Sequence, residues 1–264
     1  QYWVEREKLD KVYPFPQGYH ALRMNKDGVL GMVTGVGTAR AAANIMALGL
    51  DPRFDLKDAY WIVAGIAGID PADGSLGSAA WAEWVVDGDL AHEIDAREIP
   101  PNWTTGYVPL RKSVPFELPR SPDEGQCYQL NPALVEWAYR LTKDVQLPDT
   151  DAMRKRREAN DWVKYYTGGK GNFVTTAMED TGTLQALTFL SHAGLVRRDR
   201  VLVLRTASNY DQQRPGISAA ESLAETKIGQ YSAYLPALES AWRVGHVVVE
   251  EIAAHWDRYR APSH

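Results

Sequence analysis

The sequence predicts an α/β fold, a three-layer α/β/α sandwich with a central mixed sheet. A short apolar run at residues 29–34 enters a glycine turn and continues into an alanine-rich helix over 39–48. A second buried strand over 60–64 ends at Gly65. A strand, a helix and a strand in this order form a βαβ unit, so at least part of the sheet should be parallel.

The remaining elements follow from apolar periodicity and from end signals. Thr38 is the expected N-cap of the first helix, and Asn131-Pro132 supplies the cap and first-turn residue of a helix that runs to residue 142. Further strands are expected at 79–86, 173–175 and 201–204, and further helices at 183–192, 219–233 and 236–258. A proline-rich excursion spans about 95–130. We expect residues 1–264 to form a single domain.

Composition excludes several classes of function. The chain has 264 residues and a formal net charge of −5, so an acidic surface argues against a nucleic-acid partner. Cys127 is the lone cysteine, which excludes an intramolecular disulfide and a multi-cysteine zinc site. The longest apolar run, residues 60–69, is far shorter than the roughly 18 residues of a membrane-spanning helix, so no direct membrane span is expected.

The turn at residues 35–40 resembles a dinucleotide fingerprint that lacks its third glycine, because Arg40 stands in that place. Backbone N–H groups at the start of the following helix would suit a small anion or a hydroxyl group. A tight turn with no ligand explains the pattern equally well. The histidines show no ligand spacing. We therefore expect no metal and no cofactor.

Three segments place polar or glycine residues near the ends of predicted strands. The first is Gly65-Ile66-Ala67-Gly68, where glycine permits a ligand to approach the backbone. The second is Met178-Glu179-Asp180, at the start of an apolar helix, and the third is the polar run 206–211. Ligands of α/β sheets gather beyond the carboxyl ends of parallel strands, so the three segments predict one binding site.

These segments, in this order, resemble the nucleoside phosphorylase and nucleosidase superfamily. More narrowly, residues 48–56, 63–69 and 205–211 are similar to the purine nucleoside permease family, and the similarity runs from about Tyr13 to about Glu250. The resemblance implies a nucleoside phosphorylase-like fold whose first strand would lie upstream of residue 1. It also implies a purine nucleoside as ligand, a homo-oligomer, and a periplasmic or secreted location.

The resemblance also implies roles for individual residues. Glu179 would accept hydrogen bonds from the ribose hydroxyls, and Met178 would pack beneath the sugar. Phe173 would flank the base. Asn209 falls at the position of the superfamily's catalytic acid, and Asp211 is an alternative acid two residues later. Gly65, Ile66, Gly68 and Ser208 complete the set of expected substrate-binding residues.

Two departures from the superfamily pattern bear on the reaction. Asn209 replaces the usual aspartate, and an amide can donate a hydrogen bond but cannot supply a proton. Ile66 replaces the usual serine or threonine, and no arginine precedes the glycine turn, which weakens a phosphate site. Two functions therefore stay open. One is cleavage of the N-glycosidic bond, a glycosyl transfer to water or to phosphate as co-substrate. The other is non-catalytic nucleoside binding that supports uptake.

Overall fold

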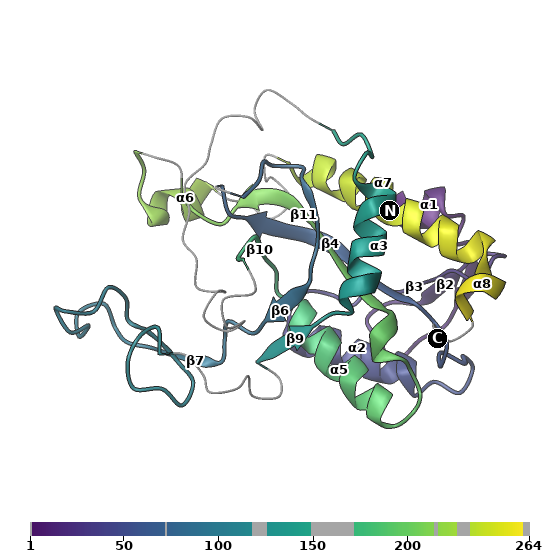
Figure 1. Cartoon of the computed structure of the whole chain (residues 1–264), viewed down its shortest axis with the longest axis horizontal. Coiled ribbons are helices and arrows are strands. Elements are labelled where there is room, and N and C mark those ends of the chain that lie inside the picture. The colour runs from purple at the N-terminus through teal and green to yellow at the C-terminus, as the bar shows by residue number, and fades with distance from the viewer. Residues whose placement is uncertain are drawn as a thin grey trace.

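A four-stranded mixed sheet forms the centre of the molecule (Figure 1). The computed structural model describes residues 2–71, 73–117, 126–148, 172–213, 216–225 and 233–260. The strand order is β10 (Thr175–Thr176), β4 (Trp61–Ile69), β11 (Val201–Tyr210) and β5 (Ala79–Trp81). β4 and β11 are parallel, and the two outer strands run antiparallel to them. The predicted central mixed sheet is confirmed.

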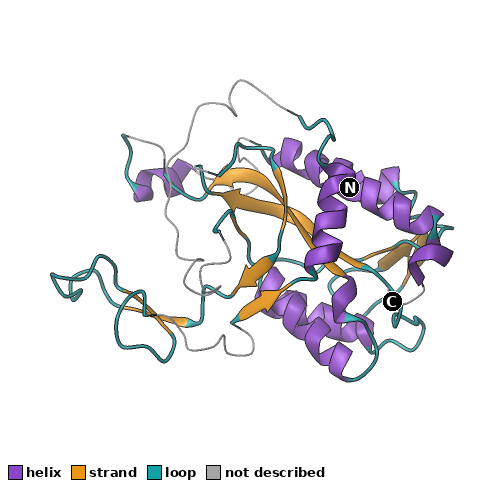
Figure 2. Ribbon diagram, viewed as in Figure 1, coloured by secondary structure: helices purple, strands orange, loops and turns teal. Residues whose placement is uncertain are grey.

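Helices cover both faces of this sheet (Figure 2). Alternate side chains of β11 point to opposite faces, and Thr206 bonds to α7 (Tyr234–Ala254) whereas Arg205 bonds to the start of α5 (Asp180–His192). α2 (Thr38–Gly49) packs against α5 in the second layer. Val201–Ser208 is buried throughout, as expected for a strand covered on both faces. The three-layer sandwich is thus the observed architecture.

Smaller elements surround the sandwich. β1, β2 and β3 form a three-stranded antiparallel sheet, β6 pairs with β9, and β7 pairs with β8 in an excursion from the main body (Figure 1). These strands are β1 (Lys11–Tyr13), β2 (Leu22–Met24), β3 (Leu30–Gly31), β6 (Trp84–Val86), β7 (Ala91–Glu93), β8 (Tyr107–Pro109) and β9 (Cys127–Gln129). The remaining helices are α1 (Tyr2–Arg6), α3 (Pro132–Thr142), η2 (Arg198–Arg200), α6 (Ala219–Glu225) and α8 (Trp256–Arg260).

The predicted βαβ unit is wrong, although a parallel strand pair exists. β3 covers only Leu30–Gly31 and pairs with β2, so the strand before α2 lies outside the central sheet. Gly35 and Gly37 have φ angles of 76° and 97°, and these left-handed residues turn the chain toward α2 instead of extending the strand. The parallel partner of β4 is β11, which comes about 130 residues later in sequence.

Several predicted boundaries also differ. β4 does not end at Gly65 but continues to Ile69, and β11 runs six residues past Leu204. The strand expected at 79–86 is two strands, because the chain leaves β11 after residue 82 and pairs with β9. The helix expected at 236–258 is interrupted at His255.

Helix ends show which capping predictions hold. The Asn131 side chain accepts hydrogen bonds from the N–H groups of Ala133 and Leu134, so the predicted N-cap of α3 is confirmed. Thr38 is not an N-cap but the first residue of α2, and its hydroxyl bonds to the Met178 carbonyl. α6 ends at Glu225, and the rest of the helix expected at 219–233 falls largely on 226–232, outside the described residues. Residues 118–125 of the proline-rich excursion are likewise outside them.

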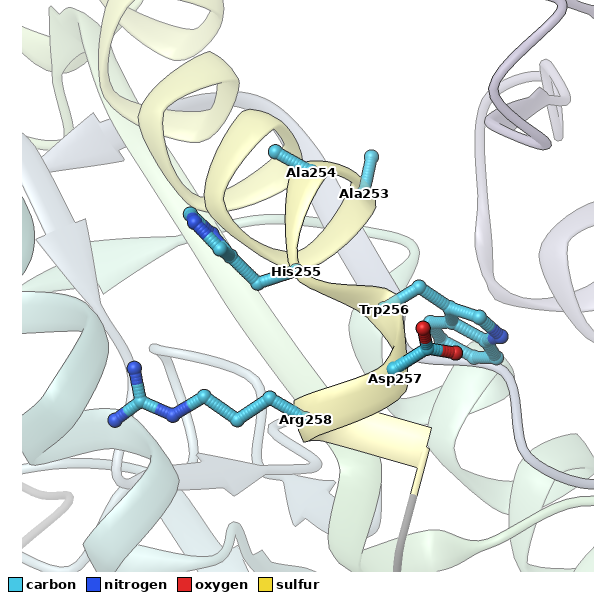
Figure 3. Close-up of a pocket in the computed structure, with 6 residues that line it drawn as sticks. All are labelled: Ala253, Ala254, His255, Trp256, Asp257 and Arg258. Carbon is cyan, nitrogen blue, oxygen red and sulfur yellow. The ribbon is translucent and has the colours of Figure 1, made fainter.

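Two further observations concern membrane-spanning helices and a depression on the surface. No helix in the described ranges is long and apolar enough to cross a membrane. A shallow depression at the end of α7 is lined by residues 253–258, with His255 and Arg258 on one side and Trp256 and Asp257 on the other (Figure 3). It lies about 25 Å along α7 from the end of the helix that contacts Thr206. The three predicted site segments do not contribute to it.

Candidate functional site

The strand register brings two of the three predicted site segments together. On the parallel pair, Arg205 lies opposite Gly65 and Asn209 lies opposite Gly68. The register shifts between Ala207 and Asn209, so Ser208 forms a bulge in β11. Bulges re-aim side chains and are common next to functional sites. The glycine segment and the polar run therefore lie side by side at the carboxyl end of the two central strands.

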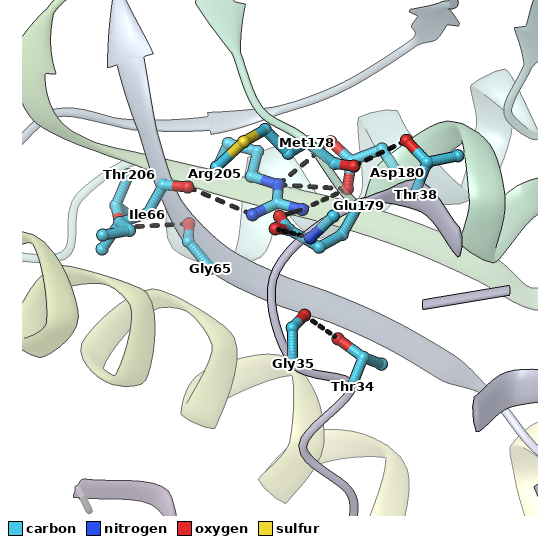
Figure 4. Close-up of polar contacts among 11 residues, drawn as sticks. Thr34, Gly35, Thr38, Gly65, Ile66, Met178, Glu179, Asp180, Arg205 and Thr206 are labelled. Atoms are coloured by element: carbon cyan, nitrogen blue, oxygen red, sulfur yellow. Dashed lines mark hydrogen bonds and ion pairs between the residues drawn. The ribbon is translucent and has the colours of Figure 1, made fainter. Parts of the chain in front are cut away.

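Arg205 is the centre of this site (Figure 4). Its side chain is only 6% exposed, and its Nε donates to both Asp180 carboxylate oxygens at 3.0 and 3.1 Å. Nη2 donates to Asp180 and, at 3.2 Å, to Glu179 Oε2, whereas Nη1 donates to the Ile66 carbonyl at 3.1 Å. One guanidinium group thus links β11, β4 and the start of α5.

The charge state of Arg205 follows from these contacts. Burial alone would lower the pKa of Arg205, but the carboxylates of Asp180 and Glu179 outweigh it and raise that pKa. The guanidinium is therefore charged throughout the working pH range, and it holds two carboxylates at a buried position. Sequence reasoning missed Arg205, although an arginine that directly follows the apolar run 201–204 in a buried strand requires a buried partner.

Glu179 is held from two sides. Its Oε2 accepts from Arg205, and its Oε1 accepts from the backbone N–H of Gly37 at 3.1 Å, just before α2 begins. The Thr38 hydroxyl donates to the Met178 carbonyl at 2.9 Å, which fixes the same segment. A carboxylate has about four acceptor positions, so two remain for other donors. Met178 itself is 61% exposed beside this carboxylate.

Gly65 and Gly68 each leave space for a neighbouring polar side chain. A Cβ atom added at Gly65 would lie 2.4 Å from Arg205 Nη1, which is far inside contact distance. A Cβ atom at Gly68 would lie 3.3 Å from Asp211 Cβ and 3.4 Å from Asn209 Nδ2. Gly65 therefore makes room for the Arg205 guanidinium group, and Gly68 faces the side chains at positions 209 and 211.

The Asn209 amide is oriented by its neighbours. Ser208 Oγ donates to Asn209 Oδ1 at 2.8 Å, and Asn209 Nδ2 donates to the Tyr210 carbonyl at 3.0 Å. Ser208 Oγ also lies 3.2 Å from the Ala67 carbonyl. These contacts fix the amide with its N–H₂ end toward the backbone of residue 210, and they leave one N–H of Nδ2 to donate elsewhere.

Asp211 lies at the same strand end, among other acidic groups. Its backbone N–H donates to the Ile69 carbonyl, and the Thr176 hydroxyl donates to its Oδ2 at 3.4 Å. Partial burial of the carboxyl group and the nearby negative charges of Asp70 and Asp73 raise the pKa of Asp211. A carboxyl group with a raised pKa retains its proton to higher pH, which suits a general acid.

Phe173 approaches the site through β10. Asp70 N–H donates to the Val174 carbonyl at 2.9 Å, and Asn172 Nδ2 donates to Asp73 Oδ1 at 2.9 Å, so residues 172–174 are tied to the loop after β4. The Phe173 side chain is only 8% exposed. Its predicted contact with a base stays a prediction, as do the ligand roles of the other site residues.

The arrangement can recognise polar hydroxyl groups at one end and donate hydrogen bonds or a proton at the other. Within the described ranges, no three His, Cys, Asp or Glu side chains are arranged to hold a metal ion. The groups that the site offers are the carboxylates of Glu179, Asp180 and Asp211, the Arg205 guanidinium and the Asn209 amide.

Comparisons with known proteins agree with this architecture. A family model described as purine nucleoside permease matches residues 1–159 and 155–263. A Schizosaccharomyces pombe protein named as a probable purine nucleoside permease is 31% identical over 266 residues, covering 85% of this chain and 76% of that protein. The purine nucleoside permease of Candida albicans is 28% identical over 264 residues, and the match spans 86% of this chain but only 64% of that protein.

Solved structures share the fold at low sequence identity. Futalosine hydrolase of Helicobacter pylori superposes with a TM-score of 0.54 at 12% identity, covering 94% of this chain and 93% of that one. The 5′-methylthioadenosine/S-adenosylhomocysteine nucleosidase of Neisseria meningitidis gives 0.53 at 14% identity, with 95% and 94% coverage. Identities this low establish the nucleoside phosphorylase-like fold alone. The family model and the S. pombe relative go further, and by them this chain belongs to the purine nucleoside permease family.

Proposed function

We propose that this protein binds purine nucleosides between α5, β4 and β11 and cleaves their N-glycosidic bond. The observation that carries the proposal is that Glu179 is held by Arg205 in β11, while Asn209 and Asp211 lie at the carboxyl end of the same strand. The names of the relatives point to purine nucleosides, and the shared fold is one on which nucleosidases are built.

Glu179 is proposed to bind the ribose. Its two fixed contacts, to Arg205 and to the Gly37 N–H, orient the carboxylate before any ligand arrives. The two remaining acceptor positions suit the pair of hydroxyl groups on one face of a ribose ring. The exposed Met178 side chain offers an apolar surface for the sugar beside this carboxylate, and Phe173 is proposed to flank the base.

The purine ring is proposed to lie against Asn209 and Asp211. As the bond between C1′ and the base nitrogen breaks, its electron pair moves into the purine ring, which then requires a hydrogen bond or a proton. Asn209 has one N–H left to donate, and Asp211 has a carboxyl group with a raised pKa. Asn209 would therefore orient the ring while Asp211 supplies the proton.

Base release tests this proposal. Inosine, adenosine and guanosine are incubated with the protein and free base is quantified by chromatography. We expect release that falls as the pH rises through the pKa of Asp211, because the acid form is required, and that Asp211→Asn removes this pH-dependent limb. Glu136→Gln, on an exposed face of α3, is the control and should match the wild type. No release of base from any of the three nucleosides would reject the enzymatic proposal.

A second function, nucleoside binding without cleavage in support of uptake, is favoured by one observation. Asn209 cannot supply a proton, and its amide is engaged with Ser208 and with the Tyr210 backbone. Saturable nucleoside binding by calorimetry, with no base released on long incubation, would select this alternative.

Location and assembly complete the proposal. We propose that the protein is periplasmic or secreted and forms a homo-oligomer, because it belongs to this family. Cell fractionation with an antibody tests the first, and light scattering on the purified protein tests the second. Recovery in the cytoplasmic fraction, or a mass of one chain at all concentrations, would contradict them.

A further inference from the structure

We infer that the site uses water, not inorganic phosphate, as its second substrate, because the protein's own carboxylates occupy the positions that a bound phosphate would need. The inference rests on the proposed cleavage of an N-glycosidic bond. It adds the identity of the group that receives the sugar.

Among the described residues, Arg205 is the cation that lies within this site, and its charge is already neutralised. Asp180 accepts from both Nε and Nη2, and Glu179 accepts from Nη2, so two carboxylates face one guanidinium group. Nη1 is engaged by the Ile66 carbonyl. The group of three side chains therefore carries a net negative charge, and it would repel a phosphate dianion in a partly buried site.

The start of α2 is the second feature that could hold an anion, and it too is filled. The Gly37 N–H donates to the Glu179 carboxylate, and the Thr38 hydroxyl donates to the Met178 carbonyl. A helix N-terminus favours a negative charge, and here that charge is Glu179 itself. From the sequence, the turn at residues 35–40 is either an anion site or a turn without a ligand. In the structure, this turn binds a carboxylate of the protein itself.

The starts of α2 and α5 are closely packed beside these contacts. A Cβ atom at Gly182 would lie 2.2 Å from the Thr38 carbonyl oxygen, so the start of α5 lies directly against the start of α2. Arg40 is the other described cation of this turn, and its guanidinium group lies over the Tyr19 ring at 5.6 Å. Arg40 contacts no residue of the Arg205 cluster through a hydrogen bond or ion pair among the described residues.

Water can receive the sugar with the groups that this site offers. A water oxygen bonds to C1′ as the bond to the base nitrogen breaks, and the departing electron pair enters the purine ring, which takes a proton from Asp211. The proton lost by the water returns to Asp211 through solvent. The products are free ribose and free base, and the sum of atoms and charge equals that of nucleoside plus water.

Two measurements on the intact protein test the inference. The first is base release from inosine with and without phosphate, together with identification of the sugar. We expect a rate independent of phosphate and ribose as the sugar product. Ribose 1-phosphate, or a rate that saturates with phosphate, would overturn the inference. No base release at all would reject the proposed cleavage and with it the role of water, and the second measurement would then test only the exclusion of phosphate.

The second measurement is a titration of inorganic phosphate followed by ³¹P NMR and calorimetry, which does not require turnover. We expect no saturable binding by the wild type. Asp180→Asn keeps the shape of the side chain and removes one of the two carboxylates that face Arg205, so the group changes from net negative to neutral and should bind phosphate more strongly than the wild type does. Asp51→Asn removes the carboxylate of a separate Asp–Arg pair outside the site and should bind phosphate no more strongly than the wild type. Saturable phosphate binding by the wild type would overturn the inference.

Discussion

Gly65→Ala tests whether the Arg205 network is as tightly fixed as the geometry indicates. The added Cβ would lie 2.4 Å from Arg205 Nη1, and ordinary contact begins at 3.4 Å, so the guanidinium group must move by about 1 Å. Arg205 cannot simply rotate away, because Asp180, Glu179 and the Ile66 carbonyl hold its nitrogens.

The expected cost follows from what this movement breaks. A shift of about 1 Å disrupts at least one charge-assisted hydrogen bond, which is worth about 1.5–3 kcal/mol. Alanine also lowers the entropy of the unfolded chain, which offsets about 0.4–1 kcal/mol. We therefore expect Gly65→Ala to lower the free energy of unfolding by about 0.5–2.6 kcal/mol. Urea unfolding followed by tryptophan fluorescence measures it.

Gly68→Ala is the matched control, since it makes the same change three residues along the same strand. Its added Cβ would meet atoms at 3.3 and 3.4 Å, so the loss of stability should be small, below about 1 kcal/mol. In an Arg205→Met background the cost of Gly65→Ala should largely disappear, because the contact is gone. Equal costs at the two glycines, or an unchanged cost in that background, would refute the reasoning.

Three further predictions concern stability. Arg205→Met leaves the buried carboxylate of Asp180 without its cation, and urea unfolding should show a loss of about 3–5 kcal/mol; a loss below 1 kcal/mol would be inconsistent with a buried pair. Asn131→Ala removes the N-cap of α3 and should cost about 1 kcal/mol by the same assay, whereas no change would mean that the cap is not made in solution. Hydrogen bonds from Arg53 lower the pKa of Asp51 to about 2. The Asp51–Arg53 pair therefore stabilises the fold fully above the pKa of aspartate in the unfolded chain, about 3.9, and this contribution is lost as the pH falls toward 2. The stability difference between wild type and Asp51→Asn should shrink over that pH window, and a constant difference would argue against the lowered pKa.

Much of the fold could be predicted from the sequence, because buried strands and capped helices leave local signals. The run 201–204 is apolar without interruption, and Asn131-Pro132 marks a helix start, and both predictions are confirmed. The partner of β4 could not be predicted, since β11 is about 130 residues away and strand pairing over that distance leaves no local pattern. The extent of a single domain over 1–264 stays a prediction.

The sequence predicts that the glycine segment and the Asn209 region lie at one edge of the sheet, and the register of β4 and β11 pairs them. The ligand roles of the site residues stay predictions. Arg205 and Asp180 were not assigned a role. Their importance arises from a contact between β11 and α5 that depends on tertiary packing, and only the anomaly of a charge inside an apolar strand signalled it.

Calorimetric titration of inosine into the wild type, Glu179→Ala and Glu136→Ala tests the central claim most directly. The claim is that a nucleoside binds at the Glu179 carboxylate beside β4 and β11. We expect saturable binding by the wild type and by the Glu136→Ala control, and a loss of about 1.5–3 kcal/mol in Glu179→Ala, which is roughly 10- to 100-fold in affinity. Equal affinity for wild type and Glu179→Ala, with both proteins folded by circular dichroism, would contradict the account.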